Sequence, residues 1–151
     1  MRKTDLFWFL AILALSGCAS VTLKPVDFSW SFESVLTADS GGFVRAEPKT
    51  IAFNAGELFR AEMKDPGAAA GTMVRIIRDY DGYYFITAPG FRHVYIFNGK
   101  KGKLTLRKKV LIAEQGMEKP FFNRRDPGVE LVANGQAYLL SGKGIVSGGK
   151  K

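Results

Sequence analysis

Cysteine and histidine often carry chemistry in proteins, and each occurs only once in this chain of 151 residues, as Cys18 and His93. A single cysteine cannot form an intramolecular disulfide or complete a multi-cysteine zinc or iron–sulfur pattern. One histidine likewise leaves too few ligands for the common structural zinc sites. The sequence therefore predicts no metal site and no cofactor.

The surroundings of His93 and of the serines favour structural roles over catalytic ones. His93 alternates with aromatic residues in "FRHVYIF", and no serine, cysteine or carboxylate lies at a motif spacing from it. Ser40 and Ser141 stand in "SGG" and "SGKG", which are turn sequences and not the G-x-S-x-G elbow that presents a nucleophile. We therefore predict no catalytic residue and no enzymatic activity.

Asp79 and Asp81 flank Tyr80 at the end of a predicted hairpin. Two carboxylates at this spacing could hold a calcium ion weakly, but an Asp-Gly turn explains Asp81 without a metal. An enzyme would remain conceivable if folding brought the distant residues His93, Asp79 and Arg124 into one cleft.

Positive charge is concentrated in one short stretch of the chain. The net charge is +8 and the isoelectric point about 9.7, which indicates attraction to anionic surfaces. Two interpretations stay open: a surface that binds anionic partners, or a solvated hairpin whose lysines protect an edge strand from aggregation. Strand alternation predicts Arg107 and Lys109 on one face and Lys108 on the other. The cluster consists of Lys100, Lys101, Lys103, Arg107, Lys108 and Lys109.

The first residues have the pattern of a secretory signal peptide. Arg2 and Lys3 precede the uncharged apolar run Leu6–Leu15, and the small residues Ser16 and Gly17 follow it. The run is too short to span a bilayer, which takes roughly 20 apolar residues. Residues 1–17 are therefore predicted to be an export signal.

The end of this segment, "LSGC", resembles the lipobox of bacterial lipoprotein precursors. Leu15, Ser16, Gly17 and Cys18 fit all four positions of that motif. The resemblance covers about the first twenty residues, and the family of the remaining domain is not recognised. It implies a covalent diacylglyceryl group on the sulfur of Cys18, cleavage after Gly17 and N-acylation of the new terminus. Such acyl chains would anchor the protein to the membrane without a spanning segment.

The residue after the cysteine bears on which membrane holds the anchor. In proteobacterial lipoproteins an aspartate there tends to retain the protein in the inner membrane, and this chain has Ala19. The resemblance thus favours the outer membrane, with the domain facing the periplasm. Besides the bilayer, expected partners are envelope proteins, lipopolysaccharide or peptidoglycan, and no nucleic acid. We expect a non-enzymatic interaction or accessory domain; the alternative is a binder of a lipid or glycan ligand.

The rest of the chain predicts an all-β fold, an antiparallel β-sandwich or a small barrel of about 8–10 strands. In Val26–Ser34, for example, Val26, Phe28, Trp30 and Phe32 alternate with polar residues. We divide the chain into a signal peptide (1–17), a lipidated N-terminus and tether (18–25), a single β-rich domain (26–146) and a basic C-terminal tail (147–151).

Three dipeptides predict the hairpin turns: Asp81-Gly82, Asn98-Gly99 and Asn134-Gly135. For Asp81-Gly82 the expected turn is type I′. Two stretches do not fit a series of hairpins. Residues 56–71 predict one short helical turn or a strand followed by a flexible loop, and residues 114–128 predict a long loop.

Overall fold

The computed structural model describes residues 22–23, 32–46 and 51–146. The predicted signal peptide, most of the tether and the C-terminal tail lie outside these residues. The described part contains twelve strands, one α-helix and one short 3₁₀ helix. The strands are β1 (Thr22–Leu23), β2 (Ser34–Thr37), β3 (Phe43–Ala46), β4 (Ile51–Asn54), β5 (Met73–Arg78), β6 (Tyr83–Thr87), β7 (His93–Lys100), β8 (Lys103–Leu111), β9 (Phe121–Arg125), β10 (Gly128–Ala133), β11 (Gln136–Ser141) and β12 (Gly144–Ile145); the helices are α1 (Gly56–Met63) and η1 (Pro66–Ala69).

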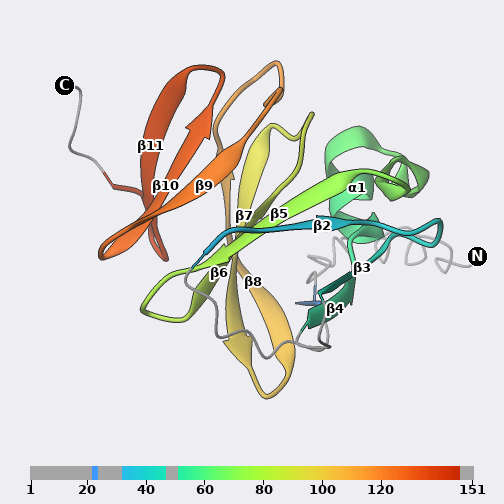
Figure 1. Cartoon of the computed structure of the whole chain (residues 1–151), viewed down its shortest axis with the longest axis horizontal. Coiled ribbons are helices and arrows are strands. Elements are labelled where there is room, and N and C mark those ends of the chain that lie inside the picture. Colours follow the sequence, from blue (N-terminus) through green and yellow to red (C-terminus); the bar gives the residue numbers. More distant parts are fainter. Residues whose placement is uncertain (1–21, 24–31, 47–50, 147–151) are drawn as a thin grey trace, which may run out of the picture.

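The strands form three antiparallel sheets, which confirms the predicted all-β class. The largest sheet has the order β1-β8-β7-β6-β5-β2, the second has the order β12-β11-β10-β9, and β3 pairs with β4. The sheets do not close into a barrel. Figure 1 shows the six-stranded sheet in the middle of the molecule, with β9–β11 on one side and α1, β3 and β4 on the other.

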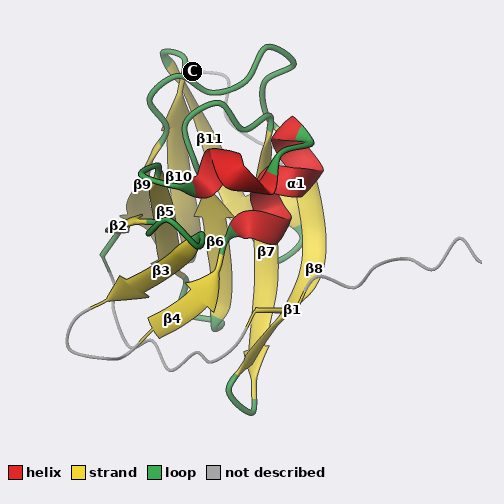
Figure 2. Cartoon of the chain, turned by 90° about the vertical axis from the view of Figure 1, so that its right-hand side faces the viewer, coloured by secondary structure: helices red, strands yellow, loops and turns green. Residues whose placement is uncertain are grey.

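The central strands of the six-stranded sheet are buried on both faces. Successive residues of a strand point to opposite faces, and the neighbours Ile76 and Ile77 in β5, like Phe85 and Ile86 in β6, are all fully buried. Figure 2 shows α1 and the β3–β4 pair lying over one face, with β9 and β10 behind the sheet. Such a sheet requires near-continuous apolar runs in its central strands, and "FIT" and "VYIF" supply them.

Two of the three predicted turns differ from the prediction. Asn134 and Gly135 both have positive φ, at 51° and 75°, as a type I′ turn requires. At Asp81-Gly82 only the glycine has positive φ, and its N–H donates to the carbonyl of Asp79. The type I′ prediction there was wrong, because the turn runs from Asp79 to Gly82 and uses Gly82 as its left-handed last residue.

Asn98-Gly99 is not a turn at all. Both residues lie inside β7, and Gly99 pairs with Leu104 of β8. A Cβ on Gly99 would lie 2.7 Å from Cε2 of the buried Tyr84 ring, so this glycine is needed for close packing. The chain reverses instead at Lys101-Gly102, whose φ angles of 50° and 72° have the signs of a type I′ turn.

The two stretches that fit no hairpin contain regular structure. Residues 56–71 form a full α-helix and a 3₁₀ helix, in place of the predicted short helical turn or strand followed by a flexible loop. The amide of Gly56 donates to Asn54 Oδ1, and Asp65 caps η1 by accepting from the amide of Gly67. Residues 114–128, predicted to be a loop, contain β9.

The prediction of a strand over Val26–Ser34 falls mostly on residues 24–31, outside the described part. Its last residue, Ser34, begins β2. Phe32, which the prediction places on the buried face of the strand, is 74% exposed. Among the described residues, no helix is long and apolar enough to cross a bilayer.

Candidate functional site

The most concentrated polar chemistry in the described structure surrounds Glu62, near the end of α1. The side chain of Glu62 is only 1% exposed. Its Oε1 lies 2.6 Å from the hydroxyl of Tyr95, 2.9 Å from Nδ1 of His93 and 3.3 Å from Nζ of Lys109. Its Oε2 accepts a hydrogen bond of 2.8 Å from the amide of Arg92. One buried carboxylate thus receives four donors from the central sheet and the loop before it.

The positions of these donors follow from strand periodicity and register. His93 and Tyr95 are two residues apart in β7 and so point to the same face of the sheet. Lys109 of β8 lies directly opposite Tyr95, and its ammonium group is 5.3 Å from the centre of that ring. The helix is held over this face by apolar contacts as well, since the rings of Phe59 and Phe91 meet edge to face at 4.8 Å.

The contacts of Glu62 decide its protonation. Burial raises the pKa of Glu62. The hydrogen bonds from Tyr95 and the Arg92 amide, together with the charges of His93 and Lys109, lower the pKa by more than burial raises it, so the pKa of Glu62 lies below its ordinary value. Burial and the neighbouring carboxylate both raise the pKa of Tyr95. Glu62 is therefore a carboxylate and Tyr95 a protonated donor, a pair suited to holding α1 on the sheet.

Glu62 also orients the imidazole of His93, whose side chain is 19% exposed. A carboxylate on Nδ1 is the usual way to fix a histidine tautomer, and it leaves Nε2 for other contacts. In the described residues no serine, threonine or cysteine side chain hydrogen-bonds to this ring. Within the described part of the chain, the imidazole is therefore oriented by Glu62 but is not hydrogen-bonded to a nucleophile that it could activate.

Sequence reasoning missed Glu62 because the contact joins residues 31 positions apart. A signal was nevertheless present. Glu62 follows Leu58 by four residues and Phe59 by three, so on a helix it lies on the same stripe as these two buried side chains. A carboxylate on the apolar face of a helix needs buried partners, and the basic and phenolic residues of β7 and β8 provide them.

The three residues whose convergence would favour an enzyme do not come together. Asp79 follows β5, and its Oδ1 accepts from the amide of Tyr83. Arg124 of β9 stacks over the ring of Tyr80, with its guanidinium carbon 3.8 Å from the ring centre. Tyr83 pairs with Asn98, so this hairpin lies toward the end of β7 opposite to His93, roughly 17 Å away along the strand. Asp79 serves to shape its turn.

The basic cluster is divided by an irregularity in the β7–β8 pairing. The register shifts between Ile96 and Phe97, so Arg107 of β8 has no direct partner. Lys109 faces α1 and is committed to Glu62, whereas Lys108 donates to the carbonyl of Lys143 beside β12. The expected sharing of a face by Arg107 and Lys109 rested on an unbroken alternation, and the bulge breaks it.

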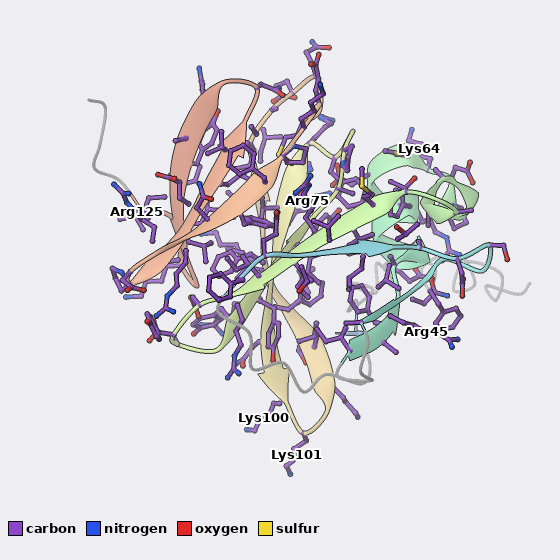
Figure 3. The ribbon with its side chains drawn as sticks, viewed as in Figure 1. Arg45, Lys64, Arg75, Lys100, Lys101 and Arg125 are labelled. Carbon is purple, nitrogen blue, oxygen red and sulfur yellow. The ribbon has the colours of Figure 1, made fainter. Side chains whose placement is uncertain are left out.

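The remaining basic residues lie at the far end of the hairpin. Lys100 and Lys103 pair with each other across the turn formed by Lys101-Gly102, and all three lysines are exposed. Figure 3 shows Lys100 and Lys101 at the protruding tip of the molecule. The short strand β1 pairs with β8 just above this tip, with Thr22 opposite Thr105 and Leu23 opposite Leu104.

Comparisons with protein-family models, with curated proteins and with solved structures gave no match for this chain. Among the described residues, no group of three or more histidine, cysteine, aspartate or glutamate side chains is placed to hold a metal ion. The function therefore has to be argued from the residues themselves.

Proposed function

We propose that the protein is a bacterial envelope lipoprotein, held in the membrane by lipid on Cys18. The observation that carries this proposal is the sequence "LSGC" at the end of a charged and then apolar leader. A lone cysteine at this position is otherwise unexplained, because an exported protein seldom keeps one free thiol. Thioether-linked diacylglycerol and an N-terminal acyl chain together supply enough buried methylene groups for stable anchoring.

The domain that follows acts as a non-enzymatic interaction or accessory module. Its most polar buried group, Glu62, has its oxygens occupied by donors from three neighbouring segments, which supports a structural role. Positive charge on the other hand is placed on the surface, at the turn between β7 and β8. A rigid β domain with a charged projecting hairpin suits binding to another envelope component.

The outer membrane is the favoured location, with the domain in the periplasm. Ala19 follows the modified cysteine, and the acidic residue associated with inner-membrane retention is lacking at this position. Envelope proteins, lipopolysaccharide and peptidoglycan are the partners accessible there.

Metabolic labelling with a fatty acid tests the proposal. The wild-type protein should incorporate label, while Cys18→Ala should incorporate none and should accumulate with its leader uncleaved. Ser16→Thr, which keeps a small residue at that place in the motif, serves as a control that should still be labelled. Label that persists in Cys18→Ala would contradict the proposal.

A further inference from the structure

We infer that the β7–β8 hairpin docks on the membrane that holds the anchor, through contacts of its lysines and Arg107 with anionic lipid head groups. The docking surface, here named the basic edge, consists of Lys100, Lys101, Lys103 and Arg107. This inference rests on the proposed lipid anchor at Cys18. It adds a second, non-covalent attachment that fixes how the domain is oriented.

The pairing of β1 with β8 brings the strand that follows the anchor next to the basic edge. Thr22 lies opposite Thr105, so its backbone is about 5 Å from that of β8. Only three residues lie between Cys18 and Thr22, and the four steps of chain that join them reach at most about 14 Å. Lys101, at the turn, is four residues from Thr105, roughly 13 Å along the hairpin. Because β1 is antiparallel to β8 and runs toward the turn, its N-terminal end, which leads to Cys18, lies on the Arg107 side of Thr105, and Lys101 lies on the other side. The strand that follows the anchor and the basic edge therefore share the β8 edge of the sheet.

The basic edge has no compensating negative charge of its own. The segment from Asn98 to Leu111 contains no aspartate or glutamate. Among the described residues, no acidic side chain forms an ion pair with any member of the basic edge. All four side chains are exposed, so their charges are available to an external anion.

The local geometry brings like charges together. Lys100 and Lys103 are direct cross-strand partners, an arrangement that destabilises a hairpin. Lys101 occupies a left-handed position, with φ of 50°, where asparagine or glycine is normally preferred. Both features weaken the isolated hairpin, and an anionic surface that neutralises the lysines would relieve the first of them.

The other two residues of the predicted cluster are not part of this surface. Lys109 is paired with the buried carboxylate of Glu62, and Lys108 donates to a backbone carbonyl at the start of β12. Their positions explain why the docking surface is limited to the tip and outer side of the hairpin.

The test uses lipidated full-length protein reconstituted into vesicles of phosphatidylcholine, with or without phosphatidylglycerol, that carry a quencher lipid. A fluorophore is attached at Thr105→Cys, which is the only reactive thiol once Cys18 is acylated. A reference fluorophore is attached at Gln136→Cys, on the β10–β11 hairpin of the other sheet. We expect quenching at position 105 in anionic vesicles only, and little quenching at position 136.

The charge dependence is tested with two matched triple variants. Lys100→Gln, Lys101→Gln and Lys103→Gln together should lower the ratio of docked to undocked protein about 100-fold at low salt, on the basis of about fivefold per basic residue. Arg45→Gln, Lys64→Gln and Arg125→Gln remove the same charge from other parts of the surface, as Figure 3 shows, and should have little effect. Arg107→Gln provides a second variant outside the turn.

Salt that shortens the screening length from about 10 Å to about 3 Å should mimic the hairpin triple variant.

Each remaining outcome overturns the inference. Equal quenching in both kinds of vesicle, or equal losses in the two triple variants, would exclude docking through the basic edge. Loss of binding to isolated peptidoglycan by the hairpin variant, with quenching unchanged, would assign the lysines to a different partner. If Cys18 carries no lipid, labelling and reconstitution both fail, and the proposed anchor falls together with the inference; if the protein is lipidated but undocked, only the inference falls.

Discussion

At the scale of the residue, Glu62 shows how a charge is accommodated inside this domain. Its carboxylate is nearly inaccessible to water, and each oxygen accepts from donors held by the sheet. A buried charge without such partners would be strongly destabilising. Loss of these donors would therefore weaken the polar attachment of α1 to the sheet, which the apolar contacts of Phe59 supplement.

Glu62→Gln should lower the free energy of unfolding at pH 7 by about 2–4 kcal/mol, because the new amide group presents hydrogens to residues that are themselves donors. Urea denaturation measures this difference. Glu57→Gln changes an exposed glutamate of the same helix that pairs only with Arg60, and it should cost at most about 0.5 kcal/mol. Equal costs for the two substitutions would show that Glu62 is not a structural hub.

The difference in stability between the wild type and Glu62→Gln should depend on pH. The pKa of Glu62 is lowered in the folded state, so ionised Glu62 stabilises the fold above its unfolded pKa, and this stability is lost as the pH falls through the folded value. The difference in unfolding free energy between the wild type and Glu62→Gln should therefore shrink below about pH 4. A difference that grows with acidification would contradict the direction of the shift. The groups that face the Glu62 carboxylate are His93, Tyr95, Lys109 and the Arg92 amide.

At the scale of the element, local sequence predicted the strands better than the turns that join them. Runs rich in β-branched and aromatic residues predict six strands, and β5 to β8, β10 and β11 lie in these runs. The runs are residues 72–80, 83–88, 91–97, 104–113, 129–133 and 136–141. The Asn98-Gly99 turn failed because a glycine that makes room for Tyr84 has the same local sequence as a glycine that turns the chain. The helix α1 was predicted only as one helical turn or a strand, since its apolar stripe is short and contains Glu62. The strand β9 was missed because most of its residues are exposed.

Substitution by asparagine should destabilise the protein to very different extents at two glycines of the β7–β8 hairpin. Gly102→Asn should cost less than about 1 kcal/mol, because asparagine tolerates the positive φ of 72°. Gly99→Asn should cost more than about 2 kcal/mol, since its Cβ would collide with the Tyr84 ring. Thermal unfolding of the two variants distinguishes these effects. The reverse order would restore the turn to Asn98-Gly99.

At the scale of the whole molecule, one partly buried glutamate connects the two larger sheets. Glu33, just before β2, pairs with Arg75 of β5 at 2.7 Å and also accepts from the amide of Phe122 in β9 at 2.9 Å. Sequence could not predict this contact, because it joins residues 89 positions apart. The sequence predicted that strands with apolar faces pack together. It could not predict the polar contacts between the sheets, because these depend on how the sheets are arranged in space.

Glu33→Ala should destabilise the domain by about 3 kcal/mol, because it leaves Arg75 partly buried without its partner and the Phe122 amide without an acceptor. Hydrogen exchange should show faster opening at the β2–β9 boundary than at the β7–β8 boundary. Glu57→Ala, on an exposed surface, is the matched control. Uniform loss of protection across the domain would mean that this contact does not specifically join the sheets.

Mass spectrometry of the N-terminal peptide of the purified protein tests whether lipid on Cys18 anchors the chain. We predict a mature chain that begins at Cys18 and lacks residues 1–17. It should carry a diacylglyceryl group on the sulfur of Cys18 and an N-terminal acyl chain. An N-terminus at any other residue, or a free thiol at Cys18, would contradict it.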